Sequence, residues 1–374
     1  MKRPSAPLLE KTSATVFADL KDWPSVVEAL RLVRLAPEEL IRVAAVGTKE
    51  DLPLLLESRQ SGLGIMQISA TADLNVFSCR RQFGRNRRRK VEGQFLVART
   101  SVEYVYLLVA VAPSAFWRHG VSRLIDVLYP AVAVPFLTQS ELHSTLRRAQ
   151  KGAYPCGLRI QELSSKKHLN AARKRFQSVR EWTDAELDTV FRDAQERNEW
   201  FKSVTFGLIE QRNERWVSTA IRAALSKYGQ FSCNGAIDLF SRTVIPELQE
   251  VTGKRLKFFA DRERLHTRHH AAKPLQISYE TEIFRATDQA KKLVEALGRF
   301  PHGTCTILHA NPYVHLSVVD NLDYSSADVW VVAQNQILIV PQLKASAAGL
   351  KRIVNHIFEH FREGKLSEYQ GQEN

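Results

Sequence analysis

The sequence predicts a mixed α/β fold, and three observations lead to this expectation. Short runs rich in β-branched and other apolar residues, such as 103–111, are typical of strands. Other segments repeat apolar residues at helical spacing, as Leu187, Val190 and Phe191 do. Hydrophobic residues make up 44% of the 374 residues, which is enough for a sizeable core and for two or three domains.

The first expected domain covers residues 1–92 and alternates strands with helices. A helix is predicted to start near Pro24, because proline is tolerated in the first helical turn. Thr48 and Asp51 resemble a capping box ahead of a second helix. Strands are expected at 15–18, 40–46, 64–68 and 75–78, and helices from residue 25 and from residue 52.

This domain also carries an acid-x-Lys pattern within a defined order of elements. Asp19-Leu20-Lys21 ends the first strand, and a helix, a strand and a second helix lead into Gly62-Leu63-Gly64-Ile65. In this order, residues 14–80 resemble the second half of a restriction-endonuclease-like domain of the PD-(D/E)xK class. The resemblance implies that Asp19 is a Mg²⁺ ligand and that Lys21 stabilises charge at the reacting phosphate.

The sequence departs from that family in one respect. The family also needs an acid on the preceding strand, and Glu10 is the sole acid in the short segment before the first strand. With a tight turn at 11–14, Glu10 would lie about 13 Å along the strand from the position that faces Asp19. We therefore expect this unit to be inactive alone, and an ordinary exposed pair on an unrelated α/β domain is the alternative.

The sharpest basic feature is a run of cations between residues 80 and 90 that contains no acid. Like charges at this density repel one another unless solvent or a bound anion screens them. We predict a nucleic-acid-binding loop in which Phe83 is one stacking ring, and a flexible basic linker is the alternative. The cations are Arg80, Arg81, Arg85, Arg87, Arg88, Arg89 and Lys90.

An α/β unit at 93–160 and a basic, mostly helical region at 161–274 are expected next. Four cations in the helical region recur at a spacing of seven residues, which would place them on one helical face. Such a stripe can lie along a phosphate backbone, or it can be a solvated helix face. The four residues are Lys166, Lys167, Arg173 and Lys174.

The last expected domain, residues 275–374, is an αββα unit with a second nuclease-like constellation. One strand begins at Asp328, and the next ends in Gln342-x-Lys344. A turn about Asn335 would place Asp328 directly opposite Gln342, with Lys344 on the same face. Some members of the PD-(D/E)xK class use Gln-x-Lys, so the resemblance implies a candidate Mg²⁺-dependent site here.

Two features of this constellation favour a plain β-hairpin instead. Pro341 lies inside the second strand, which indicates an edge strand or a bulge. The preceding helix also lacks a well-placed acid, since Glu295 points away from its apolar face and Glu282 only flanks it.

A zinc-protease pattern occurs in the final helix. His356, Glu359 and His360 match H-x-x-E-H, in which two ligands lie one helical turn apart. That family needs a third ligand far downstream, but only residues 361–374 follow. Chance is the better explanation, and we expect no metal at these residues.

Charge and composition restrict the classes of molecule that this protein is expected to bind. The formal net charge of +13, from 53 Lys+Arg against 40 Asp+Glu, favours a polyanion, and we expect nucleic acid, DNA rather than RNA. No signal-peptide core or membrane-length apolar run occurs, so a cytoplasmic protein without a membrane partner is expected. The four cysteines stand apart, which indicates neither a zinc knuckle nor a disulfide framework.

Three functions therefore stay open. The leading one is nucleic-acid binding by a protein related to nucleases, by analogy in defence or mobile-element biology. The second is an active metal-dependent nuclease that uses Asp328, Gln342 and Lys344. The third is a protein–protein scaffold whose basic surface meets an acidic partner. No cofactor is expected, except Mg²⁺ if the protein is a nuclease.

Overall fold

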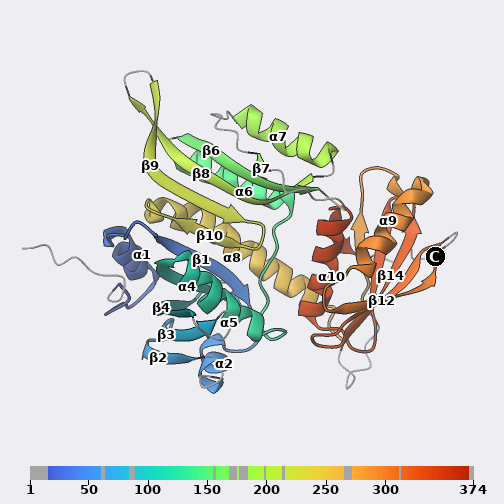
Figure 1. Cartoon of the computed structure of the whole chain (residues 1–374), viewed down its shortest axis with the longest axis horizontal. Coiled ribbons are helices and arrows are strands. Elements are labelled where there is room, and N and C mark those ends of the chain that lie inside the picture. Colours follow the sequence, from blue (N-terminus) through green and yellow to red (C-terminus); the bar gives the residue numbers. More distant parts are fainter. Residues whose placement is uncertain are drawn as a thin grey trace, which may run out of the picture.

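Two β-sheets and the helices that cover them form the structure (Figure 1), a computed structural model. It describes residues 16–59, 64–83, 89–154, 157–167, 175–176, 184–197, 199–212, 215–264, 272–310 and 313–369. The described strand pairings are antiparallel in both sheets. The chain is thus a mixed α and β protein, as predicted at this coarse level.

The first sheet has ten strands in the order β2-β3-β4-β5-β1-β10-β9-β8-β6-β7. Its strands are β1 (Glu39–Gly47), β2 (Ile65–Ala70), β3 (Leu74–Phe83), β4 (Arg89–Arg99), β5 (Val105–Pro113), β6 (Gly157–Lys167), β7 (Arg175–Phe176), β8 (Glu199–Arg212), β9 (Arg215–Ser226) and β10 (Gln230–Cys233). β1 pairs with β5 on one side and with β10 on the other, so it joins the strands of 65–113 to those of 157–233.

Alternate residues of β1 face two separate cores, which explains why this strand is apolar on both faces. Ile41 and Val43 belong to one core, and Ala44 and Val46 belong to the other. The first core is covered by α1 (Trp23–Leu32), α6 (Gln139–Gly152), α7 (Asp184–Glu196) and α8 (Ile237–Ala260). The second is covered by α2 (Leu52–Ser58), α4 (Ser114–Phe116), a π-helical turn (Trp117–Val121) and α5 (Ser122–Val127).

The second sheet has six strands in the order β12-β13-β14-β15-β11-β16. They are β11 (Leu275–Ser278), β12 (Gly303–His309), β13 (His315–Asp320), β14 (Ser325–Ala333), β15 (Gln336–Pro341) and β16 (Lys365–Glu368). A 3-10 turn (Ile283–Arg285), α9 (Thr287–Gly298) and α10 (Ala347–His360) contribute to its core. The helix–hairpin–helix pattern expected here is therefore present, with the additional strands β11, β12, β13 and β16.

Several local expectations are confirmed, and one is not. Pro24 lies in the first turn of α1, which Asp22 caps. The capping box expected from Thr48 and Asp51 is not formed, since Asp51 alone caps α2 by accepting from the Leu54 amide and Thr48 accepts from the Glu50 amide. In α7, Leu187 and Phe191 are buried as the apolar stripe predicted.

The expectation of a mostly helical region at 161–274 was wrong. β8, β9 and β10 lie there, because their backbones pair along the ten-stranded sheet and this pairing overrides the local helical pattern. The expected domain boundaries at 92 and 160 also fall inside β4 and β6, whereas the boundary at 275 coincides with the start of β11.

α8 runs through Gly253, a residue that often ends helices, and continues to Ala260. A Cβ atom on Gly253 would lie 2.5 Å from Cγ1 of Val102. The glycine therefore permits close packing of α8 against the loop before β5 rather than terminating the helix.

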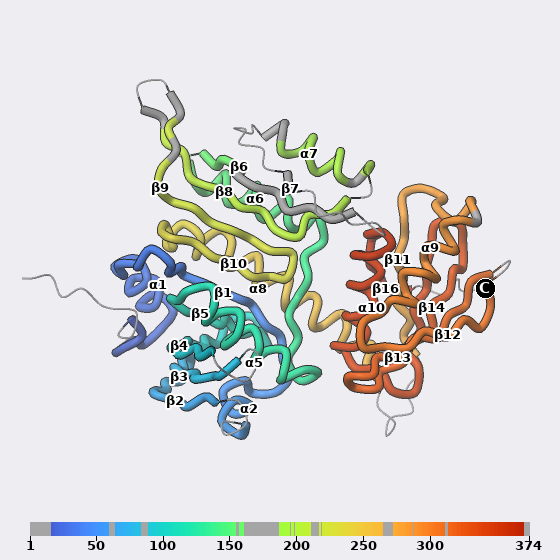
Figure 2. The backbone as a smooth tube through the Cα atoms, viewed as in Figure 1, coloured from blue at the N-terminus to red at the C-terminus, as the bar shows by residue number. Residues whose placement is uncertain are grey.

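The two parts of the molecule share a core through one aromatic residue. Phe136 lies in the segment before α6, yet it packs in the core of the second sheet, with its ring 5.7 Å from that of Phe358 and 6.5 Å from that of Phe259. In Figure 2, the same region is where α8 extends from the ten-stranded sheet toward α10. Phe136 is 1% exposed, so its burial ties the first part to the second.

We expect Phe136→Ala to destabilise the protein by about 3–5 kcal/mol, because it leaves a cavity where the two parts meet. Urea unfolding followed by tryptophan fluorescence measures this loss. Tyr154→Ala, at a side chain that is 87% exposed, is the matched control and is expected to change the stability little. A loss below about 1 kcal/mol in Phe136→Ala would contradict the shared core.

Candidate nucleic-acid interface and interdomain cavity

The expected acid-x-Lys strand end at the N-terminus is not a strand. Residues 16–19 form a turn, and Asp19 has a positive φ of 59°. Asp19 and Lys21 are both exposed, and the Lys21 amide donates to the Ser25 hydroxyl at the start of α1. The β-rich composition of this segment therefore misled the prediction, since capping of α1 determines the local backbone. Glu10 lies outside the described residues.

The C-terminal constellation is only partly assembled. Asp328 pairs across the strands with Val340 rather than with Gln342, because a register shift between Val331 and Ala333 offsets the hairpin. Gln342 still reaches Asp328 diagonally, and its Nε2 lies 2.8 Å from the Asp328 Oδ2. Lys344 instead lies 5.4 Å from the centre of the Tyr324 ring.

The contacts of Asp328 limit what this site can do. Gln342 donates its amide hydrogen to the carboxylate, and the His315 Nε2 lies 3.2 Å from the same oxygen. Two potential ligands that bind each other in this way do not converge on a common point for a cation. Among the described residues, no group of three or more His, Cys, Asp or Glu side chains could hold a metal ion.

Pro341 is accommodated without making β15 an edge strand. β15 lies between β14 and β11, but β11 pairs only as far as Ile339. Pro341 therefore lies beyond the part of the strand that is bonded on both sides, where a missing amide is tolerated.

The basic run at 80–90 lies at the β3–β4 hairpin. Arg80 and Arg81 lie in the last part of β3, which ends at Phe83, and Arg89 and Lys90 begin β4. Glu92 forms ion pairs with Lys90 and, at 3.9 Å, with Arg80. Arg85, Arg87 and Arg88 are outside the described residues.

The packing of Phe83 connects this hairpin to further cations. The Phe83 ring stacks on His119 with centroids 3.9 Å apart, so one of its faces is covered. Next to His119, the exposed Arg118 lies close enough to Arg42 for its charge, after the effect of burial, to lower the pKa of Arg42. Among the described residues, no ion pair joins Arg42 or Arg118 to an acid. Neighbouring residues of a strand point to opposite sides, so these cations lie on both sides of the β3–β4 hairpin. We call them the basic hairpin surface: Arg42, Arg80, Arg81, Arg89, Lys90 and Arg118.

Arg81 is a further cation on this surface that has a donor without a partner. Its Nη1 is buried and has no hydrogen-bond partner in the described part of the protein. Buried donors are normally paired, so a rotation of the side chain that exposes this group would let it donate to a phosphate oxygen.

The other predicted basic stripe is not helical where it is described. Lys166 and Lys167 lie in β6, where they pair with Trp200 and Glu199 of β8. Arg173 and Lys174 lie outside the described residues.

A cavity of about 240 Å³ lies between the two parts of the molecule. Its walls come from the 134–136 segment and Tyr228 on one side, and from Phe300, Pro301 and α10 on the other. Three successive turns of α10 face it with polar side chains, because residues four apart share a helical face. From α10 they are Lys351, Arg352, Asn355, His356, Glu359 and His360.

The cations of the cavity are fixed by contacts with the first part and with β13. Lys351 donates its Nζ hydrogen to the Val134 carbonyl, and burial together with Arg352 lowers its pKa to about 8. Arg352 forms an ion pair with Asp320, and its Nη2 lies 2.6 Å from the Pro301 carbonyl.

Glu359 and Asn355 form the polar floor of the cavity. Glu359 accepts hydrogen bonds from the Tyr228 hydroxyl at 2.7 Å and from Asn355 Nδ2 at 3.0 Å. Since an ionised carboxylate only accepts, this contact orients the Asn355 amide and leaves its Oδ1 free. That oxygen is buried and lacks a hydrogen-bond partner in the described structure.

The zinc-protease pattern lines the same cavity but does not form a metal site. The His356 Nε2 lies 2.7 Å from the Ala296 carbonyl, to which it must donate. Burial lowers the pKa of His356 to about 4, so the ring is neutral at pH 7.

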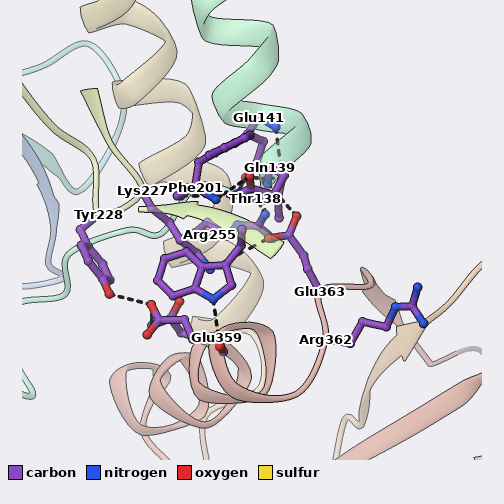
Figure 3. A network of polar contacts seen from close by, with 12 residues as sticks. Thr138, Gln139, Glu141, Phe201, Lys227, Tyr228, Arg255, Glu359, Arg362 and Glu363 are labelled. Carbon is purple, nitrogen blue, oxygen red and sulfur yellow. Dashed lines mark hydrogen bonds and ion pairs between the residues drawn. The ribbon is translucent and has the colours of Figure 1, made fainter. Parts of the chain in front are cut away.

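Beside the cavity, a network of hydrogen bonds and ion pairs surrounds the C-terminal end of α10 (Figure 3). Lys227, which is 0% exposed, lies 4.4 Å from the centre of the Trp200 ring and 4.0 Å from Glu363. The Gln139 amide donates to Glu363 at 2.6 Å, and Trp200 Nε1 donates to the Glu359 carbonyl at 2.9 Å. Burial raises the pKa of Glu363, which Lys227 opposes by attraction.

Comparisons with known proteins identify no relative. No family model and no curated protein matches the chain. Among solved structures, the chain was aligned with the β sliding clamp of C. crescentus at 8% identity, over 82% of this chain and 99% of that one. The TM-score of that alignment is 0.10, so we draw nothing from it. Within the described residues, no helix is long and apolar enough to cross a membrane.

We expect Lys227→Met to lower the free energy of unfolding by about 3–5 kcal/mol, because Glu363 is then buried without its cation. Adding Glu363→Gln removes that charge while it retains an acceptor for the Gln139 amide, so the double variant should be more stable than Lys227→Met. Urea unfolding of the two single variants and the double variant measures the coupling. Additive losses would show that the pair does not interact.

The stability should fall in mild acid because of His356. Its folded pKa of about 4 lies below the ordinary value of 6.5, so its contribution is complete above pH 6.5 and is lost as the pH falls through 4. This shift corresponds to about 3 kcal/mol. Urea unfolding between pH 7 and pH 4 should therefore show a weaker pH dependence in His356→Phe than in wild type. His309→Gln, at an exposed histidine, should follow wild type, and parallel profiles for all three proteins would contradict this role.

Proposed function

We propose that this protein binds nucleic acid, preferably DNA, through the basic hairpin surface. The observation that carries the proposal is the proximity of Arg42 and Arg118, which have no described acidic partner. Arg81, on the neighbouring hairpin, adds a donor without a hydrogen-bond partner among the described residues. Charges of one sign in this arrangement repel one another, and a polyanion relieves that repulsion. Each phosphate contact also releases cations that had condensed on the nucleic acid. Their dilution into the solvent makes binding more favourable, and the effect is larger at low salt.

The arrangement of the surface supports backbone contacts rather than base recognition. Its cations lie at strand ends and in the π-helical turn, and Phe83 is already stacked on His119. Contacts to phosphates position a protein on a strand but carry no sequence information. We therefore propose binding with little sequence preference, by a protein of the cytoplasm.

Active nuclease chemistry is the second candidate, because Asp328 and Gln342 do come within hydrogen-bond distance. It requires the Gln342 amide to turn its oxygen toward a Mg²⁺ ion and Lys344 to leave Tyr324. We do not derive such activity from Asp19 and Lys21, which lie in an exposed turn. A protein–protein scaffold is the function that would remain if nucleic acid does not bind.

The binding test is fluorescence anisotropy with duplex DNA, single-stranded DNA and RNA over a salt series. Replacing Arg81, Arg89 and Lys90 by alanine should weaken binding and reduce the slope of log K against log salt by about 2–3. The matched control removes three cations that form helical ion pairs elsewhere, namely Arg242, Lys254 and Lys292. Equal losses in both variants, or no binding at near-physiological salt, would refute the proposed surface.

The same samples with Mg²⁺ or Mn²⁺, resolved on gels, test the nuclease candidate. Cleavage that is lost in both Asp328→Ala and Lys344→Ala would assign the chemistry to the C-terminal site. Cleavage retained in both variants would remove that site from consideration.

A further inference from the structure

We infer that the cavity between the two parts binds a small phosphorylated molecule that carries hydroxyl groups, such as a sugar phosphate or a mononucleotide. The basic hairpin surface does not take part, so this inference is independent of the proposed nucleic-acid binding. It follows from the charge, the hydrogen-bonding capacity and the size of the cavity.

One cation of the cavity has no acidic partner and can receive an anion, while the acid on the floor, Glu359, already accepts from Tyr228 and Asn355. Lys351 and Arg352 are neighbours that both line it. Arg352 is neutralised by Asp320, but no ion pair joins Lys351 to an acid among the described residues, where its partner is the Val134 carbonyl. Burial, and then the charge of Arg352, lowers the pKa of Lys351. A phosphate group beside Lys351 would supply a counter-charge and strengthen the ammonium form.

The floor of the cavity favours hydroxyl groups on the same ligand. Asn355 Oδ1 is a buried acceptor without a partner, and leaving such a group unsatisfied is unfavourable. It lies on the turn of α10 that follows Lys351, on the same face of the helix. A hydroxyl of a sugar can donate to this oxygen while a phosphate on the same molecule reaches Lys351. Inorganic phosphate could satisfy only the cation.

The size of the cavity limits the ligand. A volume of about 240 Å³ lies just below the usual range for drug-sized ligands, so it admits a sugar phosphate or a mononucleotide but no longer chain. Phe300 and Pro301 add an apolar wall on which a ring can rest. The 5′-phosphorylated end of a nucleic acid offers the same chemistry, but the rest of its strand would have to leave the cavity.

The test is isothermal titration calorimetry of the full chain with ribose 5-phosphate, AMP, inorganic phosphate, ribose and a 5′-phosphorylated tetranucleotide. We expect submillimolar binding of ribose 5-phosphate or AMP, and binding about tenfold weaker for phosphate and for ribose. Heat from neither phosphorylated ligand up to millimolar concentration would overturn the proposal. Tighter binding of the tetranucleotide would show that the cavity binds the 5′ end of a nucleic acid. It would overturn the proposal of a free small ligand.

Single substitutions distinguish ligand binding in this cavity from a general effect of the protein's charge. Lys351→Met and Asn355→Asp should each weaken ribose 5-phosphate binding about tenfold or more, the second because it adds a negative charge near the phosphate. Lys292→Met, at an exposed ion pair on α9, is the matched control and should bind like wild type. The thermal unfolding of each variant is followed with and without ligand, so a loss of fold is distinguished from a loss of binding. Wild-type affinity in both Lys351→Met and Asn355→Asp would overturn the assignment.

The variant with alanine at Arg81, Arg89 and Lys90 links the two proposals. It should bind ribose 5-phosphate as wild type does, whatever its affinity for DNA. Loss of sugar phosphate binding in this variant would show that the cavity is not an independent site.

Discussion

The packing of α10 on two sides is the contact on which the arrangement of the molecule depends. On one side, Leu350, Ile353 and Ile357 are fully buried against the six-stranded sheet. On the other side, Lys351 and Glu359 bond to groups from the first part of the chain. Since close-packed interiors resist small displacements, neither part can rotate without disturbing this helix. The shape of the cavity is therefore tied to the orientation of the two parts.

The two positive regions of the protein differ in their dielectric surroundings. The basic hairpin surface is largely open to water, where salt screens charge over a distance of roughly 10 Å. It acts on a long polyanion through many weak contacts. Lys351 lies in a partly closed site, where one charge pair interacts more strongly than it would in water. Such a site can distinguish small molecules by one charged group, and its affinity depends less on salt.

Features that depend on near neighbours could be predicted from the sequence. The start of α1 at Pro24 and the turn at Asn335 follow from residue types within a few positions, and both were found. The offset of Asp328 from Gln342 could not, because one register shift in the hairpin changes every pair beyond it. The cavity was also missed, since Lys351 meets the first part only after both parts pack. The polar residues at spacing four on α10 were the available signal.

The central position of β1 has a consequence for synthesis of the chain. Its partner β5 is made soon after it, but its other partner, β10, pairs Ile41 with Cys233 and is made much later. Until then, one edge of a strand that is apolar and buried from Val43 to Val46 has no hydrogen-bonding partner in the sheet. Exposed apolar edges of this kind recruit strands from other chains. A nascent chain of this protein therefore carries an aggregation-prone edge from the synthesis of β1 until Cys233 has been made, and expression should benefit from chaperones or slow growth at low temperature.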